Sequence, residues 1–311
     1  MIQNLIQAGE PAEHRGIVVT PLFPKRDPVT EYVTLDDALP QGLRVREVDE
    51  SGSVPELVVE NPLEARVLLY DGEELVGAKQ NRILNVSVLV EAKTTLTIPV
   101  SCVEEGRWSR VSPSFASGSH ISHGQLRRRK AEAQAAQPLA RGVAQGVVWD
   151  ALYEKALHMS VDSPTGASSD LYRAHERELR VLEDAFPAQL GQCGAVLGIG
   201  NDLCLDLVSR PDAFARLWPK LRAGYLLDAL ERLDGKPSSA SAVEAFVGAI
   251  DGSLVTRQPS AGLGEDVRLR GQQVIGSGLE LEGEVIQLSA FRSEDGGRRA
   301  FGRIARPSRR Q

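Results

Sequence analysis

The sequence predicts an α+β fold, with an antiparallel β-rich amino-terminal half, as a sandwich or curved sheet, followed by helices and β-hairpins. Two observations predict it. Short strand-like segments fill the first 110 residues with no helix of length between them, so neighbouring strands should pair antiparallel. Helix-forming segments begin near residue 126, and turn-bounded strand pairs recur among them. We expect one domain over 1–291, β-rich at 1–110 and helical with hairpins at 126–291, and a disordered tail at 292–311.

The amino-terminal half contains six segments that are typical of strands. The third is followed by Asn61-Pro62, which marks a turn. The second alternates apolar and polar residues, as a half-buried strand does. The segments span 16–20, 43–48, 56–60, 67–70, 86–90 and 95–103. Residues 91–94 are expected to join the last two as a hairpin. The next segment, 109–125, is rich in Ser, Gly and His and is expected to be a loop.

The second half alternates helical segments with hairpins. Good helix formers fill the first segment, an apolar stripe marks the third, and Pro187 ends that third helix. Pro219 should kink or restart the fourth. The expected helices cover 125–137, 147–159, 171–186, 212–225 and 242–250, and the expected hairpins cover 194–208 and 267–288.

Charge and composition exclude several classes of protein. The 311 residues carry a formal net charge of −6, which argues against a nucleic-acid partner. Two basic runs, 127–130 and the arginine-rich tail, are expected to be solvated surfaces. No secretory signal or long apolar segment is present, so we expect no membrane. Three scattered cysteines fit a reducing cytoplasm.

The most informative segment is 71–85, where polar and charged residues stand between two apolar strand-like runs. Glu73 and Glu74 are candidate catalytic acids or bases, and Lys79 and Arg82 can bind a phosphate or carboxylate. Alternation should place the two glutamates on opposite faces, so at most one serves the chemistry. The amides that complete the ligand-binding set are Gln80, Asn81 and Asn85. The alternative is a charged surface hairpin without a special role.

A second part of the site is expected at 102–108. Glu104 could join Glu73 or Glu74 if their strands are neighbours, and Arg107 is placed in the ligand-binding set. Trp108 either stacks on a ring of the ligand or is an ordinary strand-end hydrophobe. Cys102 would be a nucleophile only with a depressed pKa, and a buried structural cysteine is the preferred reading. His120 and His123 have the spacing of metal ligands, but solvated loop histidines are preferred and no metal is predicted.

Four segments carry a resemblance to a known family. They read DGEELVGAKQNRILN at 71–85, TIPVSCVEEGRW at 97–108, LCLDLVSRPDAFARLWPKLRAGYLLDAL at 203–230 and VIGSGLELEGEVIQLSAF at 274–291. The chain resembles the ARG and rhodanese-phosphatase-superfamily-associated protein domain family over nearly its whole length. Gln287 stands where family members often have a histidine, which puts any role of that histidine in doubt here.

The resemblance implies a place near ADP-ribose or NAD metabolism, because the family is linked by gene association to ADP-ribosylglycohydrolases. Three hypotheses follow. The chain acts on an ADP-ribose or NAD-type nucleotide or its conjugates, as a hydrolase or transferase. It is instead a non-catalytic nucleotide- or protein-binding module that serves such an enzyme. Or it is a structural interaction protein whose charged hairpin faces solvent. The sequence names no cofactor and no oligomeric state.

Overall fold

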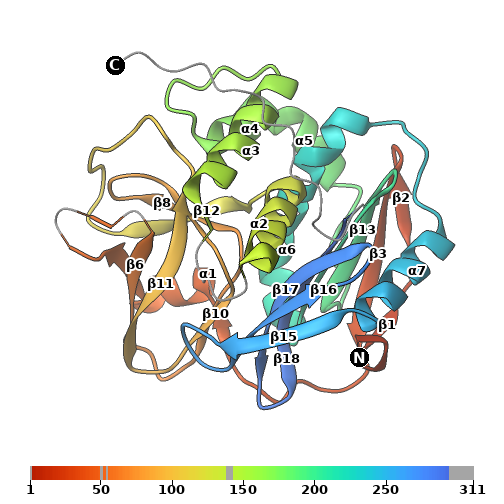
Figure 1. Ribbon diagram of the computed structural model, residues 1–311, viewed down its shortest axis with the longest axis horizontal. Helices are drawn as coiled ribbons and strands as arrows, with labels where there is room; N and C mark the ends of the chain where they lie inside the picture. Colours follow the sequence, from red (N-terminus) through yellow and green to blue (C-terminus); the bar gives the residue numbers. More distant parts are fainter. Residues whose placement is uncertain (1, 50–51, 54, 138–142, 294–311) are drawn as a thin grey trace.

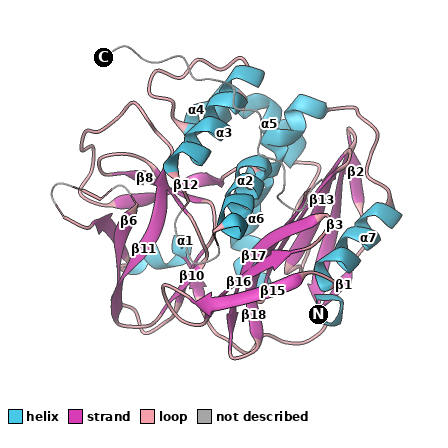
Figure 2. Cartoon of the chain, viewed as in Figure 1, coloured by secondary structure: helices cyan, strands magenta, loops and turns pink. Residues whose placement is uncertain are grey.

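The computed structural model describes residues 2–49, 52–53, 55–137 and 143–293, and it confirms the predicted α+β fold. The β-rich amino-terminal half and a larger antiparallel sheet lie on opposite sides of α2 and α6 (Figure 1). The remaining longer helices, apart from α7, gather at one end of the molecule (Figure 2). Within the described ranges, no helix is long and apolar enough to cross a membrane.

The larger sheet has nine strands in the order β1-β3-β13-β14-β18-β17-β16-β15, and β2 pairs with β3. The predicted hairpin at 194–208 is confirmed as β13–β14. Residues up to Arg292 still belong to the last strand, so the tail was predicted to begin too early; 294–311 lie outside the described residues. The strands are β1 (Ile6–Ala8), β2 (Ala12–His14), β3 (Ile17–Pro24), β13 (Gly194–Ile199), β14 (Asp202–Val208), β15 (Leu254–Pro259), β16 (Glu265–Arg270), β17 (Val274–Leu281) and β18 (Glu284–Arg292).

The first strands of the chain, β1–β3, belong to the larger sheet, whereas residues 33–121 form a six-stranded sheet, β12-β8-β9-β11-β6-β5, and a three-stranded sheet, β10-β7-β4. The hairpin expected around 91–94 is wrong: β10 pairs with β7, and β11 pairs with β6 and β9. The strands are β4 (Val33–Thr34), β5 (Arg44–Glu47), β6 (Glu56–Asn61), β7 (Val67–Leu69), β8 (Glu73–Gly77), β9 (Arg82–Leu84), β10 (Val88–Val90), β11 (Thr94–Cys102) and β12 (Phe115–Ile121).

The loop expected at 109–125 is also wrong, because it contains β12 and the start of a helix. Phe115 and Ile121 are buried, and β12 pairs with β8 along the edge of the six-stranded sheet. Ser and Gly have low strand propensity, but pairing and burial outweigh that local preference. The strand matters for the site because it covers β8, the strand that carries two of the candidate glutamates.

Each of the five expected helices has a counterpart, with two differences, and the structure also contains a short helix at Leu35–Ala38 that was not predicted. The helix expected at 171–186 is interrupted at His175, whose ψ is +21°, and continues as a second helix. Pro219 lies inside a continuous helix and does not restart it. The helices are α1 (Leu35–Ala38), α2 (Gly124–Ala136), α3 (Gln145–His158), α4 (Ser168–Ala174), α5 (Glu176–Glu183), α6 (Pro211–Ala229) and α7 (Ala240–Asp251), with 3-10 turns η1 (Ile2–Asn4), η2 (Leu39–Gln41) and η3 (Leu230–Arg232).

Helix α6 joins the two halves through a shared core. It contacts β12 on one side and β13 and β14 on the other. Phe214, Leu217 and Leu221 are buried along this helix, and burying each such side chain contributes roughly 1.5–3 kcal/mol. Gly224 allows the helix to approach β12 closely, because a Cβ at that position would lie 2.4 Å from the Ile121 carbonyl oxygen.

A buried polar network fastens α2 to the larger sheet. Arg127 donates through Nη1 and Nη2 to the Asp206 carboxylate at 2.8 and 2.7 Å, and through Nη2 to Ser289 at 2.7 Å. The Tyr70 hydroxyl donates to Asp206 at 2.5 Å, and the Tyr225 hydroxyl donates to the same carboxylate. Three segments far apart in the sequence therefore meet on one carboxylate, each with a hydrogen bond to satisfy it.

The basic run at 127–130 is not the solvated surface that we expected. Arg127 and Lys130 are each 1% exposed, and Lys130 Nζ donates to Asp71 at 2.7 Å. Residues three apart share one face of a helix, so these two cations point inward together. Their burial is possible because carboxylates from β14 and from the β7–β8 turn neutralise them.

The two neighbouring histidines are also buried, which corrects the expectation of solvated loop residues. His120 is 3% exposed and His123 is 1% exposed. His123 is the residue before α2, and its Nδ1 lies 3.0 Å from Asp228 of α6. Burial lowers the pKa of His123, against the opposing effect of the Asp228 carboxylate. Around neutral pH its ring is therefore a neutral hydrogen-bonding group that ties α2 to α6.

Candidate functional site

The polar segment forms the β8–β9 hairpin and its turn. Gly77 and Ala78 have positive φ values of +127° and +41°. A left-handed conformation at alanine costs roughly 1–2 kcal/mol. Two side chains hold the turn: Asn81 Oδ1 accepts from the Gly77 amide at 3.1 Å, and Ser112 Oγ accepts from the Ala78 amide at 2.8 Å. These hydrogen bonds fix the conformation of the turn, which lies next to the end of β11.

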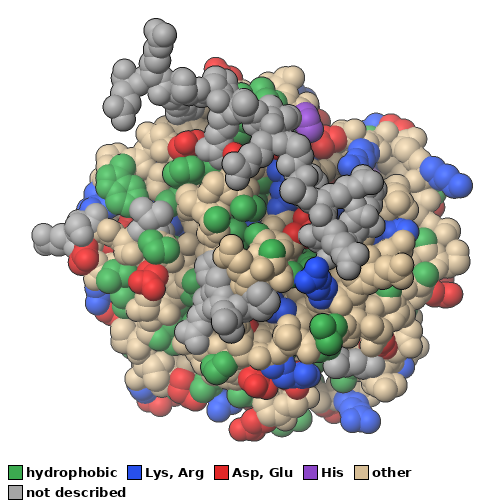
Figure 3. Space-filling model, viewed as in Figure 1, with side chains coloured by type: hydrophobic (Ala, Val, Ile, Leu, Met, Phe, Trp, Pro, Cys, Tyr) green, Lys and Arg blue, Asp and Glu red, His purple; other side chains and the backbone are tan. Residues whose placement is uncertain are grey.

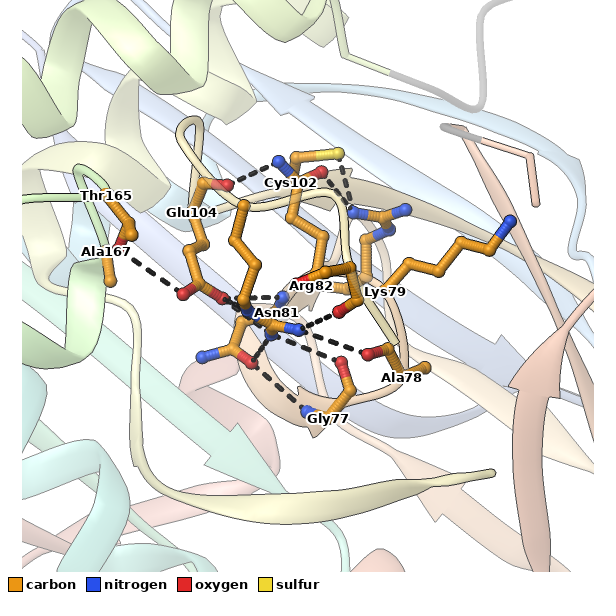
Figure 4. Close-up of polar contacts among 12 residues, drawn as sticks. Gly77, Ala78, Lys79, Asn81, Arg82, Cys102, Glu104, Thr165 and Ala167 are labelled. Carbon is orange, nitrogen blue, oxygen red and sulfur yellow. Dashed lines mark hydrogen bonds and ion pairs between the residues drawn. The ribbon is translucent and has the colours of Figure 1, made fainter. Parts of the chain in front are cut away.

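Arg107 and Glu104 form a clasp on this turn, and Figure 4 shows Glu104 beside Asn81. The guanidinium of Arg107 donates to the carbonyl oxygens of Ala78 at 3.1 Å and Gly77 at 3.3 Å, and to Asn81 Oδ1 at 3.0 Å. It also pairs with the Glu104 carboxylate at 2.6 Å. Asn81, Glu104 and Arg107 were predicted as site residues, and the structure places all three in contact. Their contacts hold the hairpin in shape.

The three candidate catalytic carboxylates face different partners. Glu73 lies 3.1 Å from Lys220 Nζ, and burial raises the pKa of this carboxyl against the effect of that lysine. Glu74 lies 3.0 Å from His120 Nε2, without hydrogen-bond geometry. Glu104 pairs with Arg107. Each carboxylate therefore has its own cationic or basic partner. Asn81 lies between two of them, donating from Nδ2 to Glu74 at 3.5 Å and from its backbone N–H to Glu104 at 3.3 Å.

Arg82 is the most unusual residue of the predicted set. It is fully buried, and its Nη1 donates to Gln80 Oε1 at 2.7 Å and contacts Cys102 Sγ at 2.8 Å. Its Nε and Nη2 have no hydrogen-bond partner among the residues that the structure describes. The strands dictate this position, because Arg82 of β9 lies opposite Cys102 of β11. We call the unpartnered Nε and Nη2 the free edge of Arg82.

Trp108 and Lys79 complete the surroundings of Arg82. The Arg82 Cζ lies 5.5 Å from the centroid of the Trp108 ring, and Lys79 Nζ lies 5.6 Å from it. Both distances are within the range of a cation–π contact. The indole is 49% exposed, so it covers the buried guanidinium at the protein surface. The Arg82 site comprises Lys79, Arg82, Cys102 and Trp108.

Cys102 is a neutral thiol in this setting. Burial raises its pKa to about 11, with Arg82 opposing the shift and Glu47 adding to it. Only a thiolate is a strong nucleophile, so this cysteine does not supply one at neutral pH. Its backbone N–H donates to Gln145 Oε1, and its carbonyl accepts from Gln145 Nε2, both at 2.8 Å. The preferred reading of a buried structural cysteine is consistent with these contacts.

The remaining predicted residues divide between the Arg82 site and its surroundings. Gln80 touches Arg82 and also donates from Nε2 to the Glu104 carbonyl. Asn85 lies elsewhere: its Oδ1 accepts from Ser101 Oγ at 2.9 Å, and its carbonyl accepts from Gln134 of α2 at 3.0 Å. Asn85 therefore joins β9, β11 and α2 and does not contribute to the Arg82 site.

Sequence reasoning missed Glu47 and Gln145. Glu47 is 9% exposed, its Oε1 accepts from the Lys79 amide at 3.3 Å, and it occupies a buried position of β5. The alternation of 43–48 contained the signal, since a carboxylate on the apolar face of a strand needs an explanation. Gln145 carried no such signal, because it is distant from Cys102 in the sequence. Among the described residues, no group of three His, Cys, Asp or Glu side chains could hold a metal ion.

Comparison with known proteins identifies the family but supplies no close relative. No curated protein and no solved structure matched the chain. The family model described as ARG and Rhodanese-Phosphatase-superfamily-associated Protein domain matches residues 5–291. This match spans the hairpin, the Arg82 site and the closing strand β18, where Gln287 donates to Ser289 at 2.5 Å. The chain therefore belongs to the ARG and Rhodanese-Phosphatase-superfamily-associated Protein domain family.

Proposed function

We propose that the chain binds an ADP-ribose or NAD-type nucleotide, with its phosphates at Arg82. The free edge of Arg82 is the observation that carries this proposal. A buried guanidinium with unpaired N–H groups is costly unless something pairs with it. Nε and Nη2 lie on the same side of a guanidinium and donate in parallel, which is the geometry that grips a phosphate or carboxylate with two hydrogen bonds.

The surroundings favour a nucleotide over a small inorganic anion. Trp108 offers an exposed aromatic face beside the two cations of the site. Bases stack on such faces, and each stack contributes roughly 1–3 kcal/mol. A small movement of the indole exposes the free edge of Arg82 to a phosphate and leaves the ring available to a base.

The family supports the choice of nucleotide, since its description associates it with ARG proteins and the resemblance implies a place near ADP-ribose or NAD metabolism. Binding fits the geometry better than catalysis does. Glu73, Glu74 and Glu104 would each have to leave a charged or basic partner before acting as an acid or base. The role that follows is a nucleotide-binding module that serves an ADP-ribose-processing enzyme.

Calorimetric titration with ADP-ribose tests this proposal. We expect saturable binding to the unmodified chain and at least a tenfold loss of affinity in Arg82→Met, because a bidentate contact to phosphate is removed. Arg257→Met is the matched control, since Arg257 of the exposed strand β15 pairs with Glu280 of β17, in a different sheet from Arg82. Absence of heat at millimolar ADP-ribose, or unchanged affinity in Arg82→Met, contradicts the proposal.

A further inference from the structure

A cavity of about 420 Å³ lies where β12 meets α4, α5 and α6. Cavities of about 300–1,000 Å³ are typical of sites for small molecules. His120 of β12 and Tyr172 of α4 line it, and Leu179 of α5 and Ala223 of α6 give it an apolar wall. The cavity therefore brings a buried histidine to a place where a ligand can lie.

His120 is directed to this cavity by a bulge in β12. Residues 118–120 stand opposite Glu74 alone in the pairing of β12 with β8. A bulge breaks the alternation of a strand and redirects a side chain, and accordingly His120 and its neighbour Ile121 are both buried. Gly118 leaves room beside the histidine, because a Cβ at that position would lie 2.8 Å from the Cβ of Glu74.

The His120 ring lies against Glu74 and Tyr172. Its Nε2 is 3.0 Å from a carboxylate oxygen of Glu74, and its centroid is 3.5 Å from that of the Tyr172 ring, in a stacked arrangement. Neither ring nitrogen has a hydrogen-bond partner among the residues that the structure describes. A carboxylate that faces Nε2 favours the tautomer with the proton on that nitrogen, which leaves Nδ1 as an acceptor. A buried acceptor without a donor is costly, so a ligand that supplies the donor is favoured.

The charged residues that line the cavity balance one another. Arg173 and Arg180 are matched by Glu176 and Glu183. The two arginine side chains are each 73% exposed and pair with carboxylates of their own helices, and such exposed pairs contribute little to stability, so either can turn to a ligand. A hydroxyl group both donates and accepts, and can pair with guanidinium and carboxylate groups alike. A ligand with a net charge would meet opposing charges here.

We propose that this cavity binds a neutral, polyhydroxylated molecule the size of a monosaccharide, with one hydroxyl group donating to Nδ1 of His120. Glu74 is the positioning residue, because it faces Nε2 and does not line the cavity. The site is independent of the proposed function. Glu74 and Arg82 belong to successive pairs of the β8–β9 ladder, so their side chains point to opposite faces of the hairpin.

Nitrogen-15 NMR of histidine side chains tests this inference. Long-range proton–nitrogen spectra report which ring nitrogen carries the proton, and His120→Phe identifies the signals of His120 by their loss. We expect a proton on Nε2 in the free chain, and a saturable shift of the Nδ1 signal on titration with ribose or glucose at millimolar concentration. Anionic ribose 5-phosphate and cationic glucosamine should bind at least tenfold more weakly than the neutral sugars.

Two variants extend the test, with the affinity for ribose and glucose measured by calorimetry. His120→Phe keeps a ring against Tyr172 and removes the acceptor, and should weaken binding at least tenfold. Ala223→Leu narrows the cavity, leaves the Glu74–His120 pair in place and should abolish the shift of the His120 signal. His158→Phe is the matched control, since His158 is exposed at the end of α3 and does not line the cavity.

Three results would overturn the inference. The first is a stationary His120 signal with both neutral sugars, and the second is a proton on Nδ1 in the free chain. The third is tighter binding of ribose 5-phosphate than of ribose, which would make the cavity an anion site. None of these bears on the binding of ADP-ribose at Arg82, which Arg82→Met tests separately.

Discussion

Two arginines are fully buried among the residues that the structure describes, and they differ in how many of their N–H groups have partners. Arg127 uses both terminal nitrogens, with Asp206 and Ser289 as partners of one and Asp206 and Tyr225 as partners of the other. Its Nε has no hydrogen-bond partner within the described part of the chain but lies 3.8 Å from the Asp71 carboxylate. Arg82 uses only Nη1, and its Nε and Nη2 have no partner among the described residues. Burial alone therefore does not distinguish an arginine with a structural role from one that can bind a ligand. The number of terminal N–H groups that have a hydrogen-bond partner does distinguish them.

The two arginines also differ in their distance from the protein surface. Arg127 lies in the interior between α2 and the larger sheet, where hydroxyl groups and carboxylates from several strands converge. Arg82 lies just beneath an exposed indole. Figure 3 shows exposed hydrophobic side chains over the loops of the β8–β12 side of the molecule. Val76 of β8 is 37% exposed, and Val111, three residues after this indole, is 64% exposed.

The largest effect is expected for Arg127→Met. Removing one partner of a buried ion pair leaves the Asp206 carboxylate without its counter-charge, which costs about 3–5 kcal/mol. Chemical denaturation of the variant should show that loss in the free energy of unfolding, or the variant should fail to fold. A loss of unfolding free energy below about 1 kcal/mol would show that the network does not stabilise the packing of α2 on the larger sheet.

A smaller effect is expected from pH, through the contribution of buried His123 to the free energy of unfolding. The folded chain holds the pKa of His123 below its ordinary 6.5, so the unfolded chain takes up this proton first as pH falls. The contribution of His123 is present above pH 6.5 and is lost below it, by at most about 1.4 kcal/mol at pH 5.5. Unfolding free energies of the unmodified chain and His123→Gln, at pH 7.5 and pH 5.5, should converge by up to that amount. A constant difference would contradict the buried neutral imidazole.

Arg82→Met should barely alter stability, in contrast to Arg127→Met. The substitution removes a guanidinium whose free edge is unpaired and replaces it with an apolar side chain of similar length. We expect the free energy of unfolding to stay within about 1 kcal/mol of the unmodified chain. A loss of about 3 kcal/mol or more would assign Arg82 to the structural class and remove the argument for a ligand.

The smallest expected effect concerns the thiol beside Arg82. A pKa of about 11 against the ordinary 9.0 leaves about one hundredfold less thiolate at neutral pH. In a chain with Cys193→Ser and Cys204→Ser, Cys102 should react with a disulfide reagent at least a hundredfold more slowly when folded than when denatured. Equal rates would show an activated cysteine and reopen its role as a nucleophile.

Periodic patterns of apolar residues within a segment correctly predicted many of the strands and helices. The alternation of 43–48 and the hairpin around Gly200-Asn201 are examples that the structure confirms. Strand β12 was missed because its pairing with β8 and its packing under α6 outweigh the poor strand propensity of Ser and Gly. The pairing of β10 with β7, rather than with β11, likewise depends on contacts between distant segments.

The candidate site was predictable in composition but not in arrangement. Residues 71–85 and 102–108 do meet, through β9 and β11 and through the Arg107 clasp. The partners that neutralise the glutamates, Lys220 and His120, lie far away in the sequence or in a segment read as loop. The inward turn of Arg127 and Lys130 depends on carboxylates 59 or more residues away, which no local pattern reveals.

The central claim is that the free edge of Arg82 binds a phosphate, and its Nε–H group can be observed directly. Nitrogen-15 NMR of arginine side chains gives one Nε–H signal for each slowly exchanging guanidinium, and Arg82→Met identifies the signal of Arg82 by its loss. We predict that titration with ADP-ribose shifts this signal saturably and leaves the signal of buried Arg127 unchanged. A stationary Arg82 signal at saturating ADP-ribose would contradict the account.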